Sequence, residues 1–293
     1  MAGTALAEPP EAQPASELRP FQPGVSIDWR NRAVYVDAHV ALRSGPLEFL
    51  ACFGGKEHES VLRFEASATH IYMALGLVGL SSGRPPRWDT EKQVYLPPEG
   101  DLIDLWIEYA KDGATRRVSG FEWTRAVEYA ETPVACPWIF AGSQVTTDGG
   151  LAADRTGEGV AVVDMPNSLL ALSRHHSSSN TELWLEADAA AIPADVSEVR
   201  VILAPAQPRT YRVSFDFRGV IFIDGRYAEP ADLAGFILLN LKLDPDYVQK
   251  IELDDVMRSD LKNIIKVLRD EGVSESAIEI CSVSPSSQPK SAR

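Results

Sequence analysis

Short runs in which apolar and polar residues alternate fill most of the chain between Val25 and Ala206. Two clear examples are "VSIDWRNRAVYVDAHVAL", which alternates on both sides of Asn31, and "DLIDLWIEYA", which is followed by "KDGA". Successive side chains of a β-strand point to opposite faces, so a period of two is typical of strands with one buried face. The pattern predicts a hairpin around Asn31 and a second hairpin closed by the Asp-Gly pair.

The rest of this region also favours strands. "LEFLACF" and "SVLRFEA" are predicted strands on either side of the polar stretch "GGKEH", whose glycines allow a sharp turn. "ATHIYMALGLVGL" is apolar all round and predicts a mostly buried helix. We therefore expect residues 24–206 to form a β-rich domain with one main buried helix. Residues 1–23 are rich in proline and alanine and are expected to be a tail.

The pattern changes at Tyr211. Two predicted strands, "YRVSFDFRG" and "VIFIDGRYA", are followed by a helix that begins at Pro230, a strand "QKIELDD", an amphipathic helix that ends at Gly272, and a last strand "AIEICSV". This order predicts a small β-β-α-β-α-β domain over residues 211–283, with a polar tail at 284–293. "APAQPRT" is the expected linker, and the fold class of the whole chain is α+β.

Composition excludes several classes of function. The 293 residues are 45% hydrophobic and 24% charged, which is typical of globular proteins. The formal net charge of −14 disfavours nucleic acid and anionic lipid as partners. No apolar run reaches the ~18 residues of a transmembrane helix. Cys52, Cys136 and Cys281 match no zinc, haem or CxxC motif, and they leave either free thiols or one Cys52–Cys136 bridge in an oxidising compartment.

The N-terminus carries a localisation signal of a limited kind. "AGTALAEPP" contains the Ala-Leu-Ala pattern found at the end of a secretory signal, without the basic and apolar regions that precede such a site. One interpretation is an exported, periplasmic protein that retains the remnant of a signal peptide. The other is an ordinary alanine-rich tail.

The stretch "CFGGKEHES", residues 52–60, concentrates groups that carry out chemistry. Cys52, His58 and His70, with Glu48 or Glu59 beside them, are the ligand types of a zinc or iron site. His70 lies near the start of the predicted helix, which would bring it over the expected hairpin. The stretch lacks the HExxH spacing of a zinc protease, so the metal hypothesis depends on these side chains converging in space.

The same residues allow two other kinds of chemistry, and they also allow a purely structural interpretation. Cys52 is a candidate nucleophile whose thiolate His58 or Lys56 would stabilise, and His58 with Glu59 is a candidate acid–base pair. We expect His58 and Glu59 to open the second strand, pointing to opposite faces. The alternative is a solvated polar turn with a hydrogen-bonded core histidine on the helix.

Two further motifs are weaker candidates. His175 and His176, in "SRHHSSSN", are expected in an exposed loop that captures metal only adventitiously. Ser143, in "WIFAGS", has no nucleophile elbow around it. The sequence contains no P-loop, dinucleotide fingerprint or EF-hand loop.

Several blocks of the first domain form a recognisable set. They are Gly45-Pro46-Leu47-Glu48, Cys52, Lys56-Glu57-His58-Glu59-Ser60, His70 with Ala74 and Leu75, and Trp138 with Gly142-Ser143. Taken together, these blocks resemble the YdjY domain family over residues 25–206. The resemblance implies a bacterial envelope and redox-associated setting.

The second domain contains the pieces "GVIFIDGRYAEPADLAGFI", "KIELDD" and "LKNIIKVLRDEGVSESAIEI". On these pieces it is similar to the periplasmic domain of the ExbD/TolR family. In that family an N-terminal transmembrane helix precedes the domain, whereas here another domain precedes it. The resemblance therefore implies a small envelope module that contacts proteins, over residues 211–283, rather than part of a proton-driven motor.

Two functional hypotheses follow. The first is an exported envelope protein whose YdjY-like domain binds a small ligand or an envelope protein partner and whose second domain makes protein contacts. The second is a metal- or thiol-dependent enzyme centred on Cys52, His58, Glu59 and His70, with Lys56 as an electrostatic helper.

Overall fold

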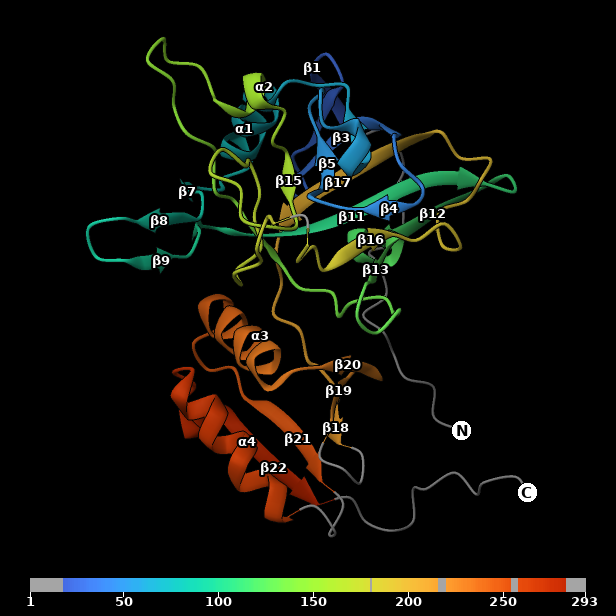
Figure 1. Ribbon diagram of the computed structural model, residues 1–293. Coiled ribbons are helices and arrows are strands. Elements are labelled where there is room, and N and C mark those ends of the chain that lie inside the picture. The colour runs from blue at the N-terminus through green and yellow to red at the C-terminus, as the bar shows by residue number, and fades with distance from the viewer. Residues whose placement is uncertain (1–17, 180, 216–219, 254–257, 283–293) are drawn as a thin grey trace. The chain divides into compact units, whose positions relative to one another are not determined.

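The computed structural model describes residues 18–179, 181–215, 220–253 and 258–282 of the chain. The chain divides into two compact units, Met1–Gln207 and Pro208–Arg293, drawn in blue to yellow and in orange to red (Figure 1). The sheets are extensive and the helices few, which confirms the α+β class. Residues 1–17 and 283–293, which include the expected signal remnant and C-terminal tail, lie outside the described residues.

A ten-stranded sheet forms the frame of the first unit. Its main path runs β12-β11-β17-β3-β6-β5-β15, while β1, β2 and β14 pair off this path (Figure 1). The strands are β1 (Leu18–Gln22), β2 (Val25–Asp28), β3 (Ala33–Val40), β5 (Phe49–Cys52), β6 (Ser60–Phe64), β11 (Leu102–Lys111), β12 (Ala114–Ser119), β14 (Trp138–Ile139), β15 (Val160–Ala161) and β17 (Glu198–Pro205). Strand β1 falls within the segment that we expected to be a tail.

Smaller elements surround this sheet. Two hairpin-like pairs, β7 with β10 and β8 with β9, follow the main helix, and three short strands form a separate sheet in the order β13-β16-β4. The bounds are α1 (Ala68–Leu77), α2 (Ala153–Thr156), η2 (Glu57–Glu59), η3 (Gly120–Trp123), β4 (Gly45–Pro46), β7 (Ser82–Arg84), β8 (Arg87–Asp89), β9 (Val94–Leu96), β10 (Glu99–Gly100), β13 (Thr124–Ala126) and β16 (Leu185–Ala187).

Both predicted hairpins are confirmed. Strands β2 and β3 pair antiparallel around Asn31, and β11 and β12 pair antiparallel through the Asp112-Gly113 turn. Asp112 and Gly113 have φ values of 53° and 74°, the left-handed backbone that a tight two-residue hairpin requires.

Alternation also decides which face of the sheet meets the core. Val34, Val36 and Ala38 of β3 are buried, whereas Tyr35 and Asp37 between them point to the outer face. The core lies on the first side, where α1 contacts β2 and β3. Its largest fully buried side chains include Trp123, Trp138, Phe49, Phe64, Phe121 and Phe140.

The expected hairpin between β5 and β6 is wrong. These two strands pair parallel, with Phe49 opposite Ser60 and Ala51 opposite Leu62. Because the two strands are parallel, residues 53–59 return the chain from the end of β5 to the level at which β5 began. Part of this return loop is the 3₁₀ turn η2. His58 and Glu59 accordingly lie in this turn and do not open the next strand, which begins at Ser60.

The main helix is confirmed, but it is shorter and more exposed than the sequence indicated. Helix α1 ends at Leu77, just before Gly79 adopts a φ of 83°. It buries Ala68, Ile71, Ala74 and Leu75, while Met73 and Leu77 on the opposite side are about half exposed. The side chain of Ser67 accepts a hydrogen bond from the backbone N–H of His70 and caps the helix start.

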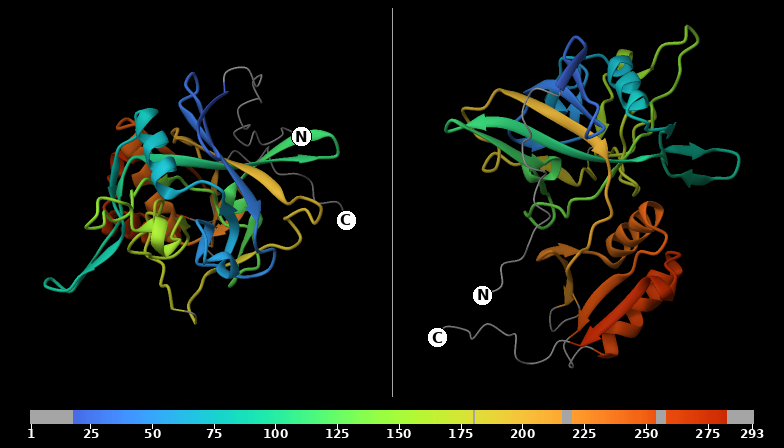
Figure 2. Two further views of the ribbon diagram at one scale, coloured as in Figure 1. Left: turned by 90° about the horizontal axis from the view of Figure 1, so that it is seen from above. Right: turned by 180° about the vertical axis from the view of Figure 1, so that it is seen from behind.

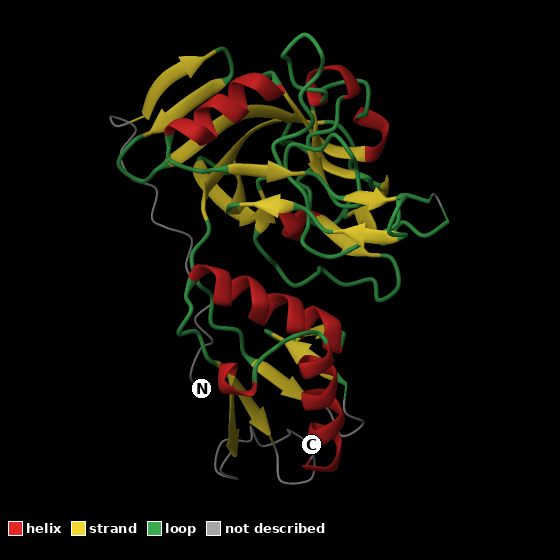
Figure 3. Cartoon of the chain, turned by 90° about the vertical axis from the view of Figure 1, so that its left-hand side faces the viewer, coloured by secondary structure: helices red, strands yellow, loops and turns green. Residues whose placement is uncertain are grey.

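The second unit is a five-stranded sheet in the order β20-β19-β18-β21-β22 with two helices (Figure 3). Its elements follow as β18 (Val213–Phe215), β19 (Ile221–Ile223), β20 (Arg226–Ala228), α3 (Pro230–Leu243), β21 (Gln249–Leu253), α4 (Arg258–Asp270), η5 (Glu275–Ala277) and β22 (Ile278–Ser282). The sequence pattern missed one strand, because "VIFIDGRYA" is the β19–β20 hairpin rather than a single strand. The order is therefore β-β-β-α-β-α-β.

Helices α3 and α4 contact each other, and their buried side chains meet one face of this sheet. Val213, Ile223 and Ile251 point into that core, together with Ile237 of α3 and Leu268 of α4. The fully buried Gln249 is satisfied there: its amide donates to the carbonyls of Tyr211 (2.8 Å) and Lys250 (2.7 Å), and its carbonyl accepts from the Tyr247 hydroxyl (2.6 Å).

Candidate functional site

The thiol of Cys52 lies beneath the surface at the end of β5. Its side chain is fully buried, and burial raises the pKa of the thiol, which hydrogen bonding to Ser60 and to the Gly54 backbone only partly offsets. Cys52, Cys136 and Cys281 are all free thiols. A buried, protonated thiol is a poor nucleophile, because the thiolate is the reactive species.

Lys56 lies between two carboxylates of the same region. Its ammonium group is 2.6 Å from Glu59 and 3.6 Å from Glu48, and it lies over the ring of Phe49. Both carboxylates are largely buried. Burial, and then the neighbouring Glu59, raise the pKa of Glu48, because two acids in one low-dielectric place disfavour a second negative charge.

The two histidines are more exposed to solvent than Cys52. The side chain of His58 is 74% exposed, and its ring approaches Glu59 at 3.6 Å. His70 is half-buried on α1. Among the residues that the structure describes, no group of three or more His, Cys, Asp or Glu side chains could hold a metal ion. The structure thus brings Glu48, Lys56 and Glu59 together, and the metal and thiol chemistry stays a prediction.

Backbone contacts hold the return loop 53–59 firmly in place. The N–H of Phe53 donates to the carbonyl of Gly157 (3.0 Å), and the N–H of Glu48 donates to the carbonyl of Glu59 (3.0 Å). Gly157, with a φ of 80°, is packed so closely that an added Cβ would lie 2.2 Å from the Gly54 carbonyl oxygen. The cluster of Lys56 with two acids therefore closes a tightly packed loop.

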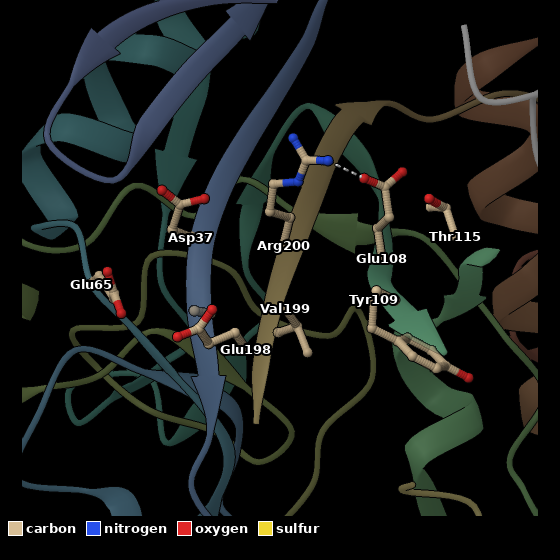
Figure 4. A pocket seen from close by; sticks show the side chains of 10 residues that line it. Asp37, Glu65, Glu108, Tyr109, Thr115, Glu198, Val199 and Arg200 are labelled. Carbon is tan, nitrogen blue, oxygen red and sulfur yellow. Dashed lines mark hydrogen bonds and ion pairs between the residues drawn. The ribbon is translucent and has the colours of Figure 1, made fainter. Parts of the chain in front are cut away.

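A groove of about 460 Å³ lies on the outer face of the main sheet (Figure 4). A row of alternating charge crosses four neighbouring strands here. Glu108 of β11 lies opposite both Arg117 of β12 and Arg200 of β17, and Arg200 lies opposite Asp37 of β3. The buried carboxylate of Glu108 binds Arg117 at 2.7 Å and Arg200 at 2.8 Å.

The row ends on Asp37, which faces Arg200 across the strands but forms no ion pair among the described residues. Arg200 is directed to Glu108, and within the part of the chain that the structure describes Asp37 forms no ion pair. Glu65 and Glu198 line the same groove. Burial, and then the charge of Glu65, raise the pKa of Asp37, and the nearby charge of Arg200 offsets only part of this rise. This end of the groove therefore has an excess of negative charge.

Sequence reasoning missed this groove. Alternation places Asp37, Glu108 and Arg200 on outer faces of their strands, and that part was readable. Which strands are neighbours was not, because β3 and β17 lie far apart in the sequence and pair only in the folded sheet. The available signal was a charged residue at an alternating position of each of these strands: Asp37 on β3, Glu108 on β11 and Arg200 on β17.

The weaker candidates have defined places. Ser143 is buried with a φ of 63°, and its hydroxyl accepts a hydrogen bond from the Ala153 N–H at the start of α2. His175 is exposed, as expected, but its ring contacts the carboxylate of Asp164. His176 is largely buried against Trp184 instead of being exposed, which corrects that expectation.

The first unit is thus an α+β domain built on one large sheet, with a closed ionic cluster at one edge and a charged groove on its outer face. Residues 25–204 match the family model of the YdjY domain, so the chain belongs to the YdjY domain family. This confirms the first resemblance. No curated protein and no solved structure matches the chain. Within the described residues, every helix is too short or too polar to cross a membrane.

Proposed function

We propose that the chain is a binding protein that acts outside the cytoplasm, and that its YdjY domain holds a positively charged group of a ligand or partner in the groove. One observation carries this proposal: the charge row Arg117–Glu108–Arg200–Asp37 ends on a carboxylate without an ion pair among the described residues. A cation bound beside Asp37 would continue the alternation of positive and negative charges by one position.

The surroundings support a cation over an anion. Glu65 and Glu198 add negative charge at the same end of the groove, and Arg200 is already bound to Glu108. Asp37 is exposed, which favours an amine or guanidinium group as the ligand. Such a cation keeps part of its hydration while it interacts with the carboxylates of the groove. A basic peptide side chain and a small amine share this chemistry.

The test measures binding of defined probes to the full chain. Calorimetric titration with acetylated tetralysine should show binding that weakens with salt, whereas acetylated tetraglutamate should show none. Asp37→Asn should weaken tetralysine binding by about fivefold to tenfold, or about 1 kcal/mol. Glu128→Gln, a change at an exposed acid outside the groove, is the matched control. Equal losses in both variants would refute a site at Asp37.

The second unit is proposed to contact a protein, as its similarity to the ExbD/TolR periplasmic domain implies. Strand β22 stands at one end of the five-stranded sheet, and Ile280 on it is 43% exposed. An edge strand with an exposed apolar side chain is a surface that a partner strand can extend. In a pull-down from the native host, the parent protein should retain a protein partner that the Ile280→Lys variant does not retain. The melting temperatures of the parent and the variant should be the same.

The location is tested separately. Fractionation of the native host should place the protein outside the cytoplasm. A stable cytoplasmic pool would count against export, and it would leave the groove experiment unaffected because that experiment uses purified protein.

A further inference from the structure

An aromatic surface lies on the β8–β9 hairpin, which extends away from the rest of the first unit (Figures 1 and 2). Trp88 lies directly opposite Tyr95 in this antiparallel pair, so both side chains project from the same face of the hairpin. Trp88 is 57% exposed. Trp88 and Tyr95 together present two neighbouring aromatic side chains on one face of a projecting hairpin, which indicates a contact surface.

Tyr95 connects this surface to the body of the unit. Its hydroxyl donates to Asp164 Oδ1 (2.9 Å), and Asp164 Oδ2 contacts Nδ1 of His175. The rings of Tyr95 and His175 are 4.7 Å apart. Trp88, Tyr95 and His175 therefore lie one after another along the surface, and the carboxylate of Asp164 binds both Tyr95 and His175.

A second aromatic pair fixes the loop that carries His175. The ring of His176 stacks on Trp184, with 4.1 Å between centroids and 8° between planes. Trp184 donates its indole N–H to the Val162 carbonyl (2.7 Å), and the Asp164 N–H donates to the His176 carbonyl (2.8 Å). His175 and Asp164 are therefore held in place before any ligand arrives.

The arrangement suits a ligand with an apolar face and a hydroxylated edge. A sugar ring has both: its C–H face packs on an exposed tryptophan, and its hydroxyls exchange hydrogen bonds with a carboxylate and an imidazole. Asp164 disfavours an anion, and among the residues that the structure describes no cluster of three or more His, Cys, Asp or Glu side chains could hold a metal ion here. Rigid aromatic side chains also lose little conformational entropy on binding.

We propose that Trp88, Tyr95, Asp164 and His175 form a binding site for a neutral sugar unit of a glycan. Trp88 supplies the stacking face, and the Asp164–His175 pair supplies the polar contacts. The site is separate from the groove beside Asp37, and it shares none of the groove's lining residues. It adds a second ligand class to the binding function proposed above and does not depend on it.

Titration of the full chain with chitotetraose and with cellotetraose, followed by calorimetry and tryptophan fluorescence, tests the site. At least one sugar should bind, and Trp88→Ala should weaken that binding by about tenfold or more. Trp29→Ala is the matched control, because Trp29 is similarly exposed, at 52%, on the turn between β2 and β3. Asp164→Asn should also weaken binding, with the melting temperature recorded to show that the variant is folded.

Three results would overturn the proposal. The first is that neither sugar binds at a concentration of about 10 mM, which is ten times the dissociation constant of about 1 mM of a weak complex. The second is an equal loss of binding in Trp29→Ala and Trp88→Ala. The third is that neither sugar binds whereas tetramethylammonium does, which would show a cation–π site in place of a sugar site.

Discussion

Lys56 shows how one side chain can stabilise a region that has the residue types of a reaction centre. It neutralises Glu59 at 2.6 Å and faces Glu48 at 3.6 Å, so the two acids share one cation. A buried carboxylate without a partner is strongly destabilising, and a second carboxylate beside it adds repulsion. The ionic contacts therefore match the needs of a folded loop without any bound metal.

Substitution of the two acids separates their roles. Glu59→Gln removes the closest partner of Lys56 and should lower the free energy of unfolding at pH 7 by about 1–3 kcal/mol. Glu48→Gln should cost less, because the amide resembles the protonated acid that burial and Glu59 already favour. Urea unfolding of both variants measures the difference. A larger loss for Glu48→Gln would contradict this account of the cluster.

Cys52 should be the least reactive thiol of the chain. Because it is fully buried and its pKa is raised, native protein should alkylate at Cys52 at least about tenfold more slowly than at Cys136 and Cys281, which are both partly exposed. Iodoacetamide labelling with peptide mass spectrometry gives the three rates, and labelling in urea should make them similar. Fastest labelling at Cys52 in the folded protein would instead support thiol chemistry there.

His176 makes stability depend on pH. Burial, followed by the nearby charges of Arg174 and His175, lowers its pKa to about 3. Between the ordinary value near 6.5 and 3, the unfolded chain binds a proton that the folded chain does not, so stability falls as pH falls. From pH 7 to pH 5 this costs up to about 2 kcal/mol at ~1.4 kcal/mol per pH unit. His176→Phe keeps the stack on Trp184 and should remove that part of the loss in urea unfolding.

At the scale of elements, α1 begins where two caps meet. Ser67 caps the helix locally, and Asp154 of α2 accepts hydrogen bonds from the backbone N–H groups of Ala68 (2.6 Å) and Thr69 (3.2 Å). A carboxylate at a helix N-terminus satisfies free donors and interacts favourably with the helix dipole. The sequence indicated the helix, but it gave no indication of a cap from a residue so distant along the chain.

Asp154→Asn should therefore lower the free energy of unfolding by about 1–2 kcal/mol, because it removes the charge and one acceptor oxygen. Asp195→Asn changes an exposed acid of the same unit and should stay within about 0.5 kcal/mol of the parent. Chemical unfolding curves provide both values. If the two substitutions have equal effects, Asp154 does not stabilise the start of α1.

Local signals explain which elements were predictable. Turn residues and alternation identified the hairpins around Asn31 and Gly113, and Pro230 marked the first residue of α3. The parallel pairing of β5 with β6 was not predictable, because two glycines between short strands indicate a hairpin equally well. That single error placed His58 and Glu59 in a strand, whereas they lie in a 3₁₀ turn, and it also assigned their side chains to the faces of a strand that they are not part of.

At the scale of the whole molecule, each unit has the core of an independent domain. In the first unit one continuous apolar cluster extends from Val25 to Leu203. In the second, Val213, Ile237 and Leu268 belong to a separate buried set contributed by strands and both helices. Domains of such sizes commonly fold alone, and exposed residues 207–208 lie where the two units meet in the sequence.

We therefore expect residues 18–207 and residues 208–293, expressed as separate proteins, to fold each on its own. Each should give dispersed amide resonances and a cooperative thermal transition, and the full chain should show both transitions. The second fragment should be the less stable, because a smaller domain buries a smaller fraction of its surface. A second fragment that stays unfolded until the first is added would show that its core alone is insufficient, and the protein-contact function proposed for it would then belong to the full chain.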